Sequence, residues 1–316
     1  MVAFPKDFCR FNLRTLLLFV FLFCLASAYY RFATSEYRAI EAIEQMGGSV
    51  TENTSEDGRL FKSATFSLLE NVDLRPLSAI EDLRQIYAIG ATLSHSHFDT
   101  LKDVSTLREL YLDDSDVDDN MLEVIGQLPN IEVLCLQRTR VSDEGLKYLK
   151  QHARIRLLDL GGTKVSDFGI KHLLGSKNLE GVNLQSTNVT GIGFQNCDAI
   201  TKLEILNLAN TRLDDEGLKY VVQCVQLKRL NVSNTRISDA GLAAVAKLPN
   251  LVELEVRRTS ISVDGLLLLC DHSNLKWIYA ERTRVTPLSA GLVENKMKGR
   301  CRIVVDMPKT FKIDNK

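Results

Sequence analysis

Five acidic side chains crowd into the seven residues from Asp113 to Asp119, a composition that suggests a calcium loop. Three alternate aspartates, beginning at Asp114, are spaced like the first ligands of an EF-hand. Such a loop also needs Gly at its sixth position and Glu at its twelfth, where this chain has Asp119 and Ile125. Because Val117 must point into the core, we expect the acids to lie on a solvated turn and to bind no metal.

Two histidines, His95 and His97, form an H-x-H pair. Two imidazoles do not complete a zinc site, and no acid or cysteine of matching spacing accompanies them. We therefore expect exposed loop histidines. The sequence also has no nucleophile elbow, phosphate-binding loop, dinucleotide fingerprint or zinc-binding helix motif. It predicts neither an enzyme nor a cofactor site.

A second set of candidate residues recurs every 24 residues and carries groups that bind rather than react. One column of this set is mostly polar or aromatic: Tyr111, Cys135, Asp159, Asn183, Asn207, Asn231, Glu255 and Tyr279. A column two residues earlier adds apolar side chains and one cation: Val133, Leu157, Ile205 and Arg229. Near the C-terminus, the only tryptophan occurs with an aromatic neighbour and several arginines: Trp277, Tyr279, Arg229, Arg257, Arg258 and Arg282.

Aromatic and arginine side chains supply much of the binding energy at protein interfaces, which makes these columns candidate contacts. The alternative is that Asn and Asp are simply tolerated on a crowded strand and that the arginines are solvated.

The interval is set by leucine and isoleucine residues that recur without a slip at Leu83, Leu107, Ile131, Ile155, Leu179, Leu203, Leu227, Leu251 and Leu275. Each begins a unit of the pattern L-x-x-L-x-L-x-x-T-x-V-x-D-x-G-L-x-x-L. A fixed period of 20 to 29 residues is typical of a stacked solenoid, in which a single unit cannot bury its apolar side alone. Units are named here by their first residue, so that unit 131 begins at Ile131.

Each unit predicts a short strand followed by a short helix. Leu134 and Leu136, at unit positions 4 and 6, alternate with polar residues, as in a strand with one buried face. Position 9 is Thr or Ser in nearly every unit and can satisfy turn backbone groups. Position 12 is often a helix-capping residue: Ser142, Ser166, Thr190, Asp214 and Ser238. We expect parallel strands about 4.8 Å apart on a concave face and short helices on the convex face.

This pattern resembles the leucine-rich-repeat superfamily, and more narrowly exported bacterial proteins whose units carry T-x-V-x-D-x-G-L. The resemblance covers residues 83–298 and implies an α/β solenoid, a right-handed superhelix. The looser stretch 59–82 joins the repeats as a cap, which places the repeats at 59–298 and a C-terminal cap and tail at 299–316. Residues 302–306 predict one closing edge strand.

The N-terminal part contains an uncharged apolar segment, residues 15–30, that follows Lys6, Arg10 and Arg14. We expect an uncleaved transmembrane signal anchor behind a cytoplasmic N-terminus at 1–14, with a cleaved signal peptide as the alternative. Both place the repeats outside the cytoplasm. The predicted helix of 16 residues spans about 24 Å, less than the roughly 30 Å of a hydrocarbon core. Residues 31–58 predict a linker and short helical cap that ends at Gly47, then a mobile loop over 51–58.

Of the seven cysteines, Cys9 and Cys24 precede or lie within the apolar segment, and the other five occupy unrelated unit positions. We therefore expect no disulfide framework, at least one unpaired thiol among the five, and mostly small buried apolar residues. The net charge of −1 gives no reason to expect nucleic acid as a partner.

The sequence therefore predicts a non-catalytic scaffold, exported and membrane-anchored through residues 15–30, that binds a protein through its concave face. The alternative is a structural or adhesive envelope protein that binds cell-surface glycan. A third hypothesis, an intracellular substrate receptor of the ubiquitin-ligase type, needs a helical module before the repeats for which the chain has little room.

Overall fold

The computed structural model describes residues 13–93, 95–150, 152–197 and 200–306. Nearly all of the predicted cytoplasmic N-terminus and the tail from Lys309 lie outside these residues. The strands are β1 Ser49–Thr54, β2 Leu60–Thr65, β3 Leu83–Tyr87, β4 Glu109–Tyr111, β5 Val133–Cys135, β6 Leu157–Asp159, β7 Gly181–Asn183, β8 Ile205–Asn207, β9 Arg229–Asn231, β10 Glu253–Glu255, β11 Trp277–Tyr279 and β12 Arg302–Val304. The α-helices are α1 Leu13–Gln45, α2 His95–Phe98, α3 Asp119–Ile125, α4 Asp143–Leu146, α5 Asp167–Leu173, α6 Asp215–Val221, α7 Asp239–Val245, α8 Val263–Leu267 and α9 Pro287–Lys296. Short 3-10 helices are η1 Arg75–Ala79, η2 Asp99–Asp103, η3 Lys147–Leu149 and η4 Ile192–Phe194.

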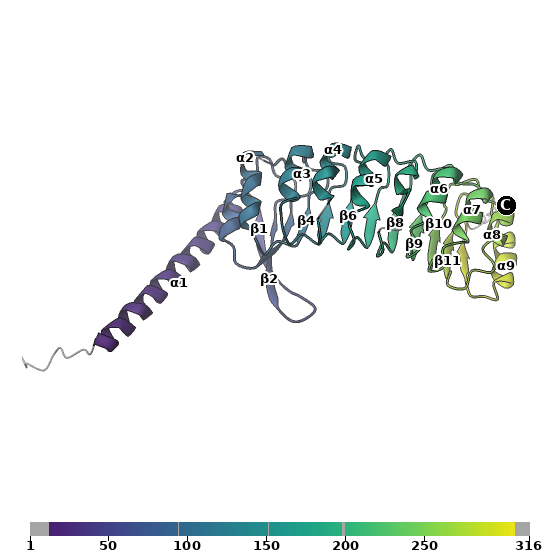
Figure 1. The fold of residues 1–316 in the computed structure, drawn as a ribbon. Coiled ribbons are helices and arrows are strands. Elements are labelled where there is room, and N and C mark those ends of the chain that lie inside the picture. The colour runs from purple at the N-terminus through teal and green to yellow at the C-terminus, as the bar shows by residue number, and fades with distance from the viewer. Residues whose placement is uncertain (1–12, 94, 151, 198–199, 307–316) are drawn as a thin grey trace, which may run out of the picture.

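The strands form one sheet whose spatial order is the chain order, β1 to β12. From β2 to β12 every neighbouring pair is parallel, and equivalent unit positions pair with each other, as Leu134 does with Leu158. The helices follow the outer side of the resulting arc and the strands its inner side, with α1 projecting from the N-terminal end (Figure 1). The predicted solenoid, with strands on the concave face, is confirmed.

The unit pattern explains each local element. Leu134 and Leu136 are fully buried, as the alternation of the strand predicts. Position 8 adopts a left-handed backbone from unit 83 to unit 275, so the chain turns sharply as it leaves each strand. The hydroxyl at position 9 then donates to the carbonyl three residues earlier at 2.5 to 2.7 Å, from Ser115 through Thr283. Position 12 caps the helix in most units, but Thr190 is an exception because its unit forms only η4 there.

An aspartate at position 13 joins neighbouring units. Asp143, at the start of α4, accepts hydrogen bonds from the Ser166 backbone N–H at 2.7 Å and from the Ser166 hydroxyl at 2.6 Å. It also accepts from the Gly169 N–H at 3.0 Å. The same contact to position 12 of the next unit is made by four other residues: Asp119, Asp167, Asp215 and Asp239. This joint links helix starts along the convex side.

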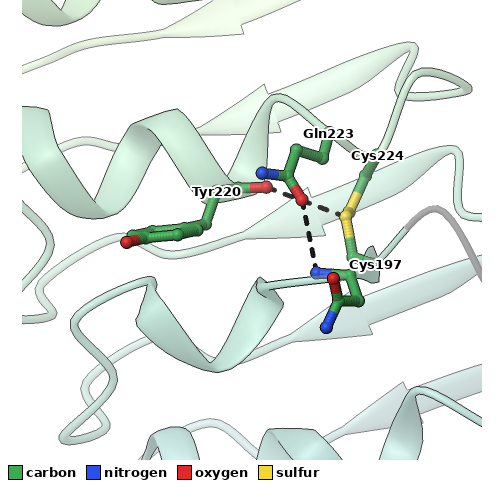
Figure 2. The surroundings of a disulfide bond; sticks show 5 residues. Cys197, Tyr220, Gln223 and Cys224 are labelled. Carbon is green, nitrogen blue, oxygen red and sulfur yellow. Dashed lines mark hydrogen bonds between the residues drawn. A yellow bond between two sulfur atoms is a disulfide. The ribbon is translucent and has the colours of Figure 1, made fainter.

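The joint between units 179 and 203 is built differently. Position 13 of unit 179 is Gly191, which has no carboxylate and adopts φ +99°. A disulfide between Cys197 and Cys224 connects the two units instead, with a Cα–Cα distance of 5.5 Å. Figure 2 shows the bond beside Tyr220 and Gln223 of α6 and the turn after it. The sequence does not predict this pair, because its contact depends on the stacking of units, which brings together positions 27 residues apart.

At the N-terminal end, α1 is one continuous helix whose last third caps the repeats. Ile43 is fully buried, and Glu36 pairs with Lys62 at 2.8 Å and accepts the Glu81 N–H at 2.9 Å. The predicted transmembrane segment, residues 15–30, lies within α1. Within the described residues, however, no helix has the length and apolar character that a membrane crossing requires. The prediction of a transmembrane helix is thus not supported.

Residues 49–65 form the antiparallel hairpin β1–β2, which contacts the end of α1 and pairs through β2 with β3. The predicted loop over 51–58 is wrong for its first half, since Thr51–Thr54 belong to β1. At the other end, β12 closes the sheet beside β11, as predicted.

Candidate functional site on the strand face

The strand face is defined here by the side chains at unit positions 3, 5 and 7 of β4 to β11, which point away from the buried positions 4 and 6. All thirteen predicted site residues belong to these strands except Arg258, which lies in the position-8 turn after β10. The sequence therefore located the face correctly. What each side chain does there differs from the prediction in several places.

The asparagine column supports the strand rather than offering free amides. Asn183, Asn207 and Asn231 each accept, through Oδ1, the backbone N–H two residues later at 2.9 to 3.0 Å. This contact satisfies the N–H of the residue that leaves the strand. Asp159 makes the same contact with the Gly161 N–H at 2.8 Å. The structural alternative raised from the sequence therefore accounts for the asparagines.

In the units whose position 5 is Cys135 or Glu255, the preceding unit supplies the acceptor. Asp113 accepts the Gln137 N–H at 2.8 Å, because Cys135 cannot. Likewise, the Ser233 hydroxyl accepts the Arg257 N–H at 3.1 Å. Asp113 thus holds a backbone position and also presents a carboxylate to the strand face.

The middle of the strand face carries an exposed apolar patch. Leu157 is 41% exposed and Ile205 is 38% exposed, and Val133 is half-buried beside them. Gly181 stands between Leu157 and Ile205 at the same unit position and leaves a gap in this column. The result is a hollow of about 430 Å³, lined also by Tyr111 and reaching Asn207.

Acidic groups surround the N-terminal end of this hollow. Burial and the nearby charges of Asp113, Asp159 and Glu109 raise the pKa of the Cys135 thiol to about 12. The pKa of Asp113 is itself raised, mainly by burial and further by Asp159 and Asp114, against the hydrogen bond from Gln137. Tyr111 donates to Glu109 at 2.8 Å, and its pKa is raised by burial and by that contact.

The C-terminal end of the strand face is aromatic and charge-paired. Trp277 is 42% exposed and stacks on Tyr279, with ring centroids 6.5 Å apart. Arg257 places its guanidinium 4.7 Å from the Tyr279 ring and pairs with Glu255 and Glu281. The sequence groups both Arg257 and Arg258 with these rings; Arg257 contacts Tyr279, whereas Arg258 lies in the position-8 turn. The left-handed turn at Arg258 directs the chain away from the strand, so Arg257, the residue before it, lies on the Tyr279 ring.

The acidic run from Asp113 to Asp119 is used within the fold. Asp116 accepts the Leu93 N–H at 2.9 Å, and Asp118 caps α3 by accepting from two backbone N–H groups. His95 and His97, predicted in a loop, lie in α2 and face Asp118 and Asp73, each at 3.2 Å. Among the described residues, no group of three potential ligands could hold a metal ion.

Comparisons with known proteins agree with this architecture. A family model described as "Leucine Rich repeat" matches residues 199–222 and 223–246. An internalin (inlF) of Listeria monocytogenes shares 15% identity with a TM-score of 0.53, covering 78% of this chain and 82% of that one. Internalin C2 of the same organism shares 18% identity with a TM-score of 0.51, covering 66% of this chain and 84% of that one. A search of curated proteins found no match.

The period and the sheet agree with the match of the leucine-rich-repeat model to residues 199–246 and with the fold of the two internalins. At this level of identity, the internalins share its fold, and they say nothing of its ligand.

Proposed function

We propose that this protein is a non-catalytic scaffold that binds a protein partner through the strand face of its repeats. The single observation that carries the proposal is the apolar hollow between Leu157 and Ile205 on an otherwise polar face. Exposed apolar side chains that gather in one place mark interaction sites, whereas single scattered ones do not. An extended inner surface is also where solenoids of this type bind.

The test is affinity capture from native cell-envelope extract with the full-length chain, in detergent, as bait. The bait variant carries Leu157→Gln and Ile205→Gln, which make the hollow polar without adding charge. Both side chains are exposed, so we expect the variant to fold. A protein held by the unchanged bait and lost from the variant would support the proposal.

The matched control carries Phe168→Gln and Val225→Gln on the helix side, where these side chains are 72% and 48% exposed. It removes at least as much exposed apolar surface from the helix side of the molecule. Partners that are lost from the control and kept by the Leu157/Ile205 variant would contradict the proposal and place binding on the helices.

A second candidate function is binding of cell-surface glycan at the C-terminal end. The observation that favours it is the exposed Trp277 stacked beside Tyr279, since flat aromatic faces can pack on sugar rings. A glycan array would test it: a specific signal that Trp277→Ala abolishes would support the glycan. An array without signal would leave the protein partner as the function.

Export and membrane attachment are part of the same proposal and rest mainly on the sequence. Four apolar side chains of α1 are each at least half exposed: Phe21, Leu22, Phe23 and Leu25. A lipid membrane would bury this apolar surface, which the protein itself leaves uncovered. The disulfide adds support for an oxidising compartment. Fractionation tests this part: recovery of the full-length protein wholly in the cytosol would contradict it.

A further inference from the structure

The hollow of the strand face lies next to acidic side chains that have no cation partner. Asp159 lines the hollow, and Asp113 and Glu109 act with it on the Cys135 thiol between them. None of these three carboxylates forms an ion pair with any residue in the described part of the chain. Arg138, in the neighbouring turn, forms its ion pair with Asp114 instead.

The neighbouring surfaces are different, because their charges are neutralised within the protein. Along position 2, Glu132 pairs with Arg108 at 2.7 Å, and Glu180 pairs with Arg156 at 2.8 Å. At the C-terminal end, Arg257 lies between two glutamates. Among the described residues, the unpaired acids of the strand face therefore lie beside the N-terminal end of the apolar hollow.

We propose that the hollow binds a basic, apolar segment of a partner protein, with an aliphatic or aromatic side chain between Leu157 and Ile205 and lysine or arginine against Asp159 and Asp113. This inference rests on the proposed function and specifies the chemistry of its partner. The hollow of about 430 Å³ accommodates an apolar side chain, and Gly181 forms its floor. A methyl group at Gly181 would lie 2.8 Å from Cδ2 of Leu157, so no side chain of this chain occupies that place without displacing Leu157.

The positive charge of the partner follows from the cost of covering the acids. Any protein that covers Leu157 and Ile205 also removes water from Asp159, which lines the same hollow. A carboxylate buried without a counter-charge is strongly unfavourable, whereas a paired one is tolerated and favours one partner over others. An acidic or purely apolar segment therefore binds poorly here. The raised pKa of Asp113 agrees, since burial and the charges of Asp159 and Asp114 already disfavour its ionised form.

The test is selection of a random twelve-residue peptide library on the full-length protein in detergent, followed by affinity measurement of the enriched peptides. The charge variant carries Asp113→Asn and Asp159→Asn. Both substitutions keep an Oδ1 that accepts the same backbone N–H, as Asn183 and Asn207 do at position 5 of their own units. The variant should therefore fold, which circular dichroism confirms or refutes directly.

We expect enriched peptides with lysine or arginine close to an aliphatic or aromatic residue, and a loss of affinity of roughly tenfold on the charge variant. The matched control, Glu132→Gln, removes a carboxylate that is already paired with arginine and should change affinity less than twofold. The loss should shrink as salt is raised.

Two outcomes would overturn this inference: enriched peptides without basic residues, or equal affinity for the unchanged protein and the charge variant. The variant with Leu157→Gln and Ile205→Gln separates the two proposals. Peptides that no longer bind the Leu157/Ile205 variant but still bind the charge variant would support the strand-face site and contradict the basic partner. Peptides that bind all variants equally, or a selection that enriches nothing, would reject both.

Discussion

The contact that holds units 179 and 203 together differs in kind from the contacts between the units on either side of it. In five other joints, an aspartate such as Asp143 holds the next unit through hydrogen bonds to its helix start. At Gly191 this carboxylate is absent, and the units are held by the disulfide and by close backbone contact at Gly217. The aspartate is also absent between units 251 and 275, where position 13 is Val263, so the 24-residue pattern tolerates its loss, and between units 179 and 203 a covalent bond takes its place.

The joint between units 179 and 203 also lies behind the proposed binding site. Unit 179 supplies Gly181, the floor of the hollow, and unit 203 supplies Ile205, one of its walls. The disulfide joins these same two units on the side away from the strand face. It therefore helps to fix the spacing of the floor and the wall.

The largest effect should come from Gly217→Ala compared with Gly241→Ala. A Cβ at Gly217 would lie 1.8 Å from the Thr190 carbonyl oxygen, which is backbone and cannot move aside. A Cβ at Gly241 would lie 2.4 Å from the end of the Asp215 side chain, which can move at the cost of its hydrogen bonds. We expect losses of about 4 kcal/mol and about 2 kcal/mol in the free energy of unfolding by urea. Equal losses would mean that the two joints are equally tolerant.

Removal of the disulfide should come next. In the variant with Cys197→Ala and Cys224→Ala, we expect the free energy of unfolding to fall by about 3 kcal/mol, since the bond closes a loop with a sequence separation of 27. Urea denaturation with and without reductant measures it. Reductant should destabilise the unchanged protein and leave the variant as it is. If reductant does not lower the free energy of unfolding of the protein without substitutions, Cys197 and Cys224 are not joined.

The polar joint should weaken by a smaller amount when its aspartate is removed. Asp143→Ala leaves the Ser166 N–H and the Gly169 N–H without acceptors, and we expect a loss of about 2 kcal/mol. Asp264→Ala is the control, because this exposed acid also lies in the first turn of its helix. Its loss should stay near 0.5 kcal/mol, roughly the helix-dipole contribution alone. Thermal unfolding of both variants gives the comparison.

The smallest effect concerns a histidine at another joint. His152 is buried and donates from Nε2 to the Leu128 carbonyl oxygen of the preceding unit at 2.7 Å. Burial lowers its pKa in the folded protein. The unfolded chain then binds more protons below pH about 6.5, so stability should fall as the pH drops through that value. His152→Gln should flatten this part of the stability profile, and an unchanged profile would contradict the assignment.

The sequence was sufficient for the features that repeat. The 24-residue period located the strands, the buried Leu134 and Leu136, the capping residues and the strand face. Features that belong to one unit were missed, because they depend on contacts between units. Gly181 indicates the hollow only when the position-3 residues of successive units are read as neighbours across the sheet, with Leu157 and Ile205 on either side. Which of the grouped arginines contacts Tyr279 depends on the left-handed turn at Arg258, and the pairing of Cys197 with Cys224 depends on stacking.

At the N-terminus, a sequence pattern favoured a membrane span, whereas the helix that contains it extends to Gln45 and ends by capping the repeats. Composition records that a segment is apolar, but it does not record where the helix ends or what its last turns contact.

Hydroxyl-radical footprinting of the protein with and without the captured partner or selected peptide tests the central claim most directly. It measures the solvent access of individual side chains. Our account predicts that Leu157 and Ile205 become protected while Phe168, exposed on the helix side, stays unchanged. Protection of Phe168 with Leu157 and Ile205 unchanged would contradict binding through the strand face.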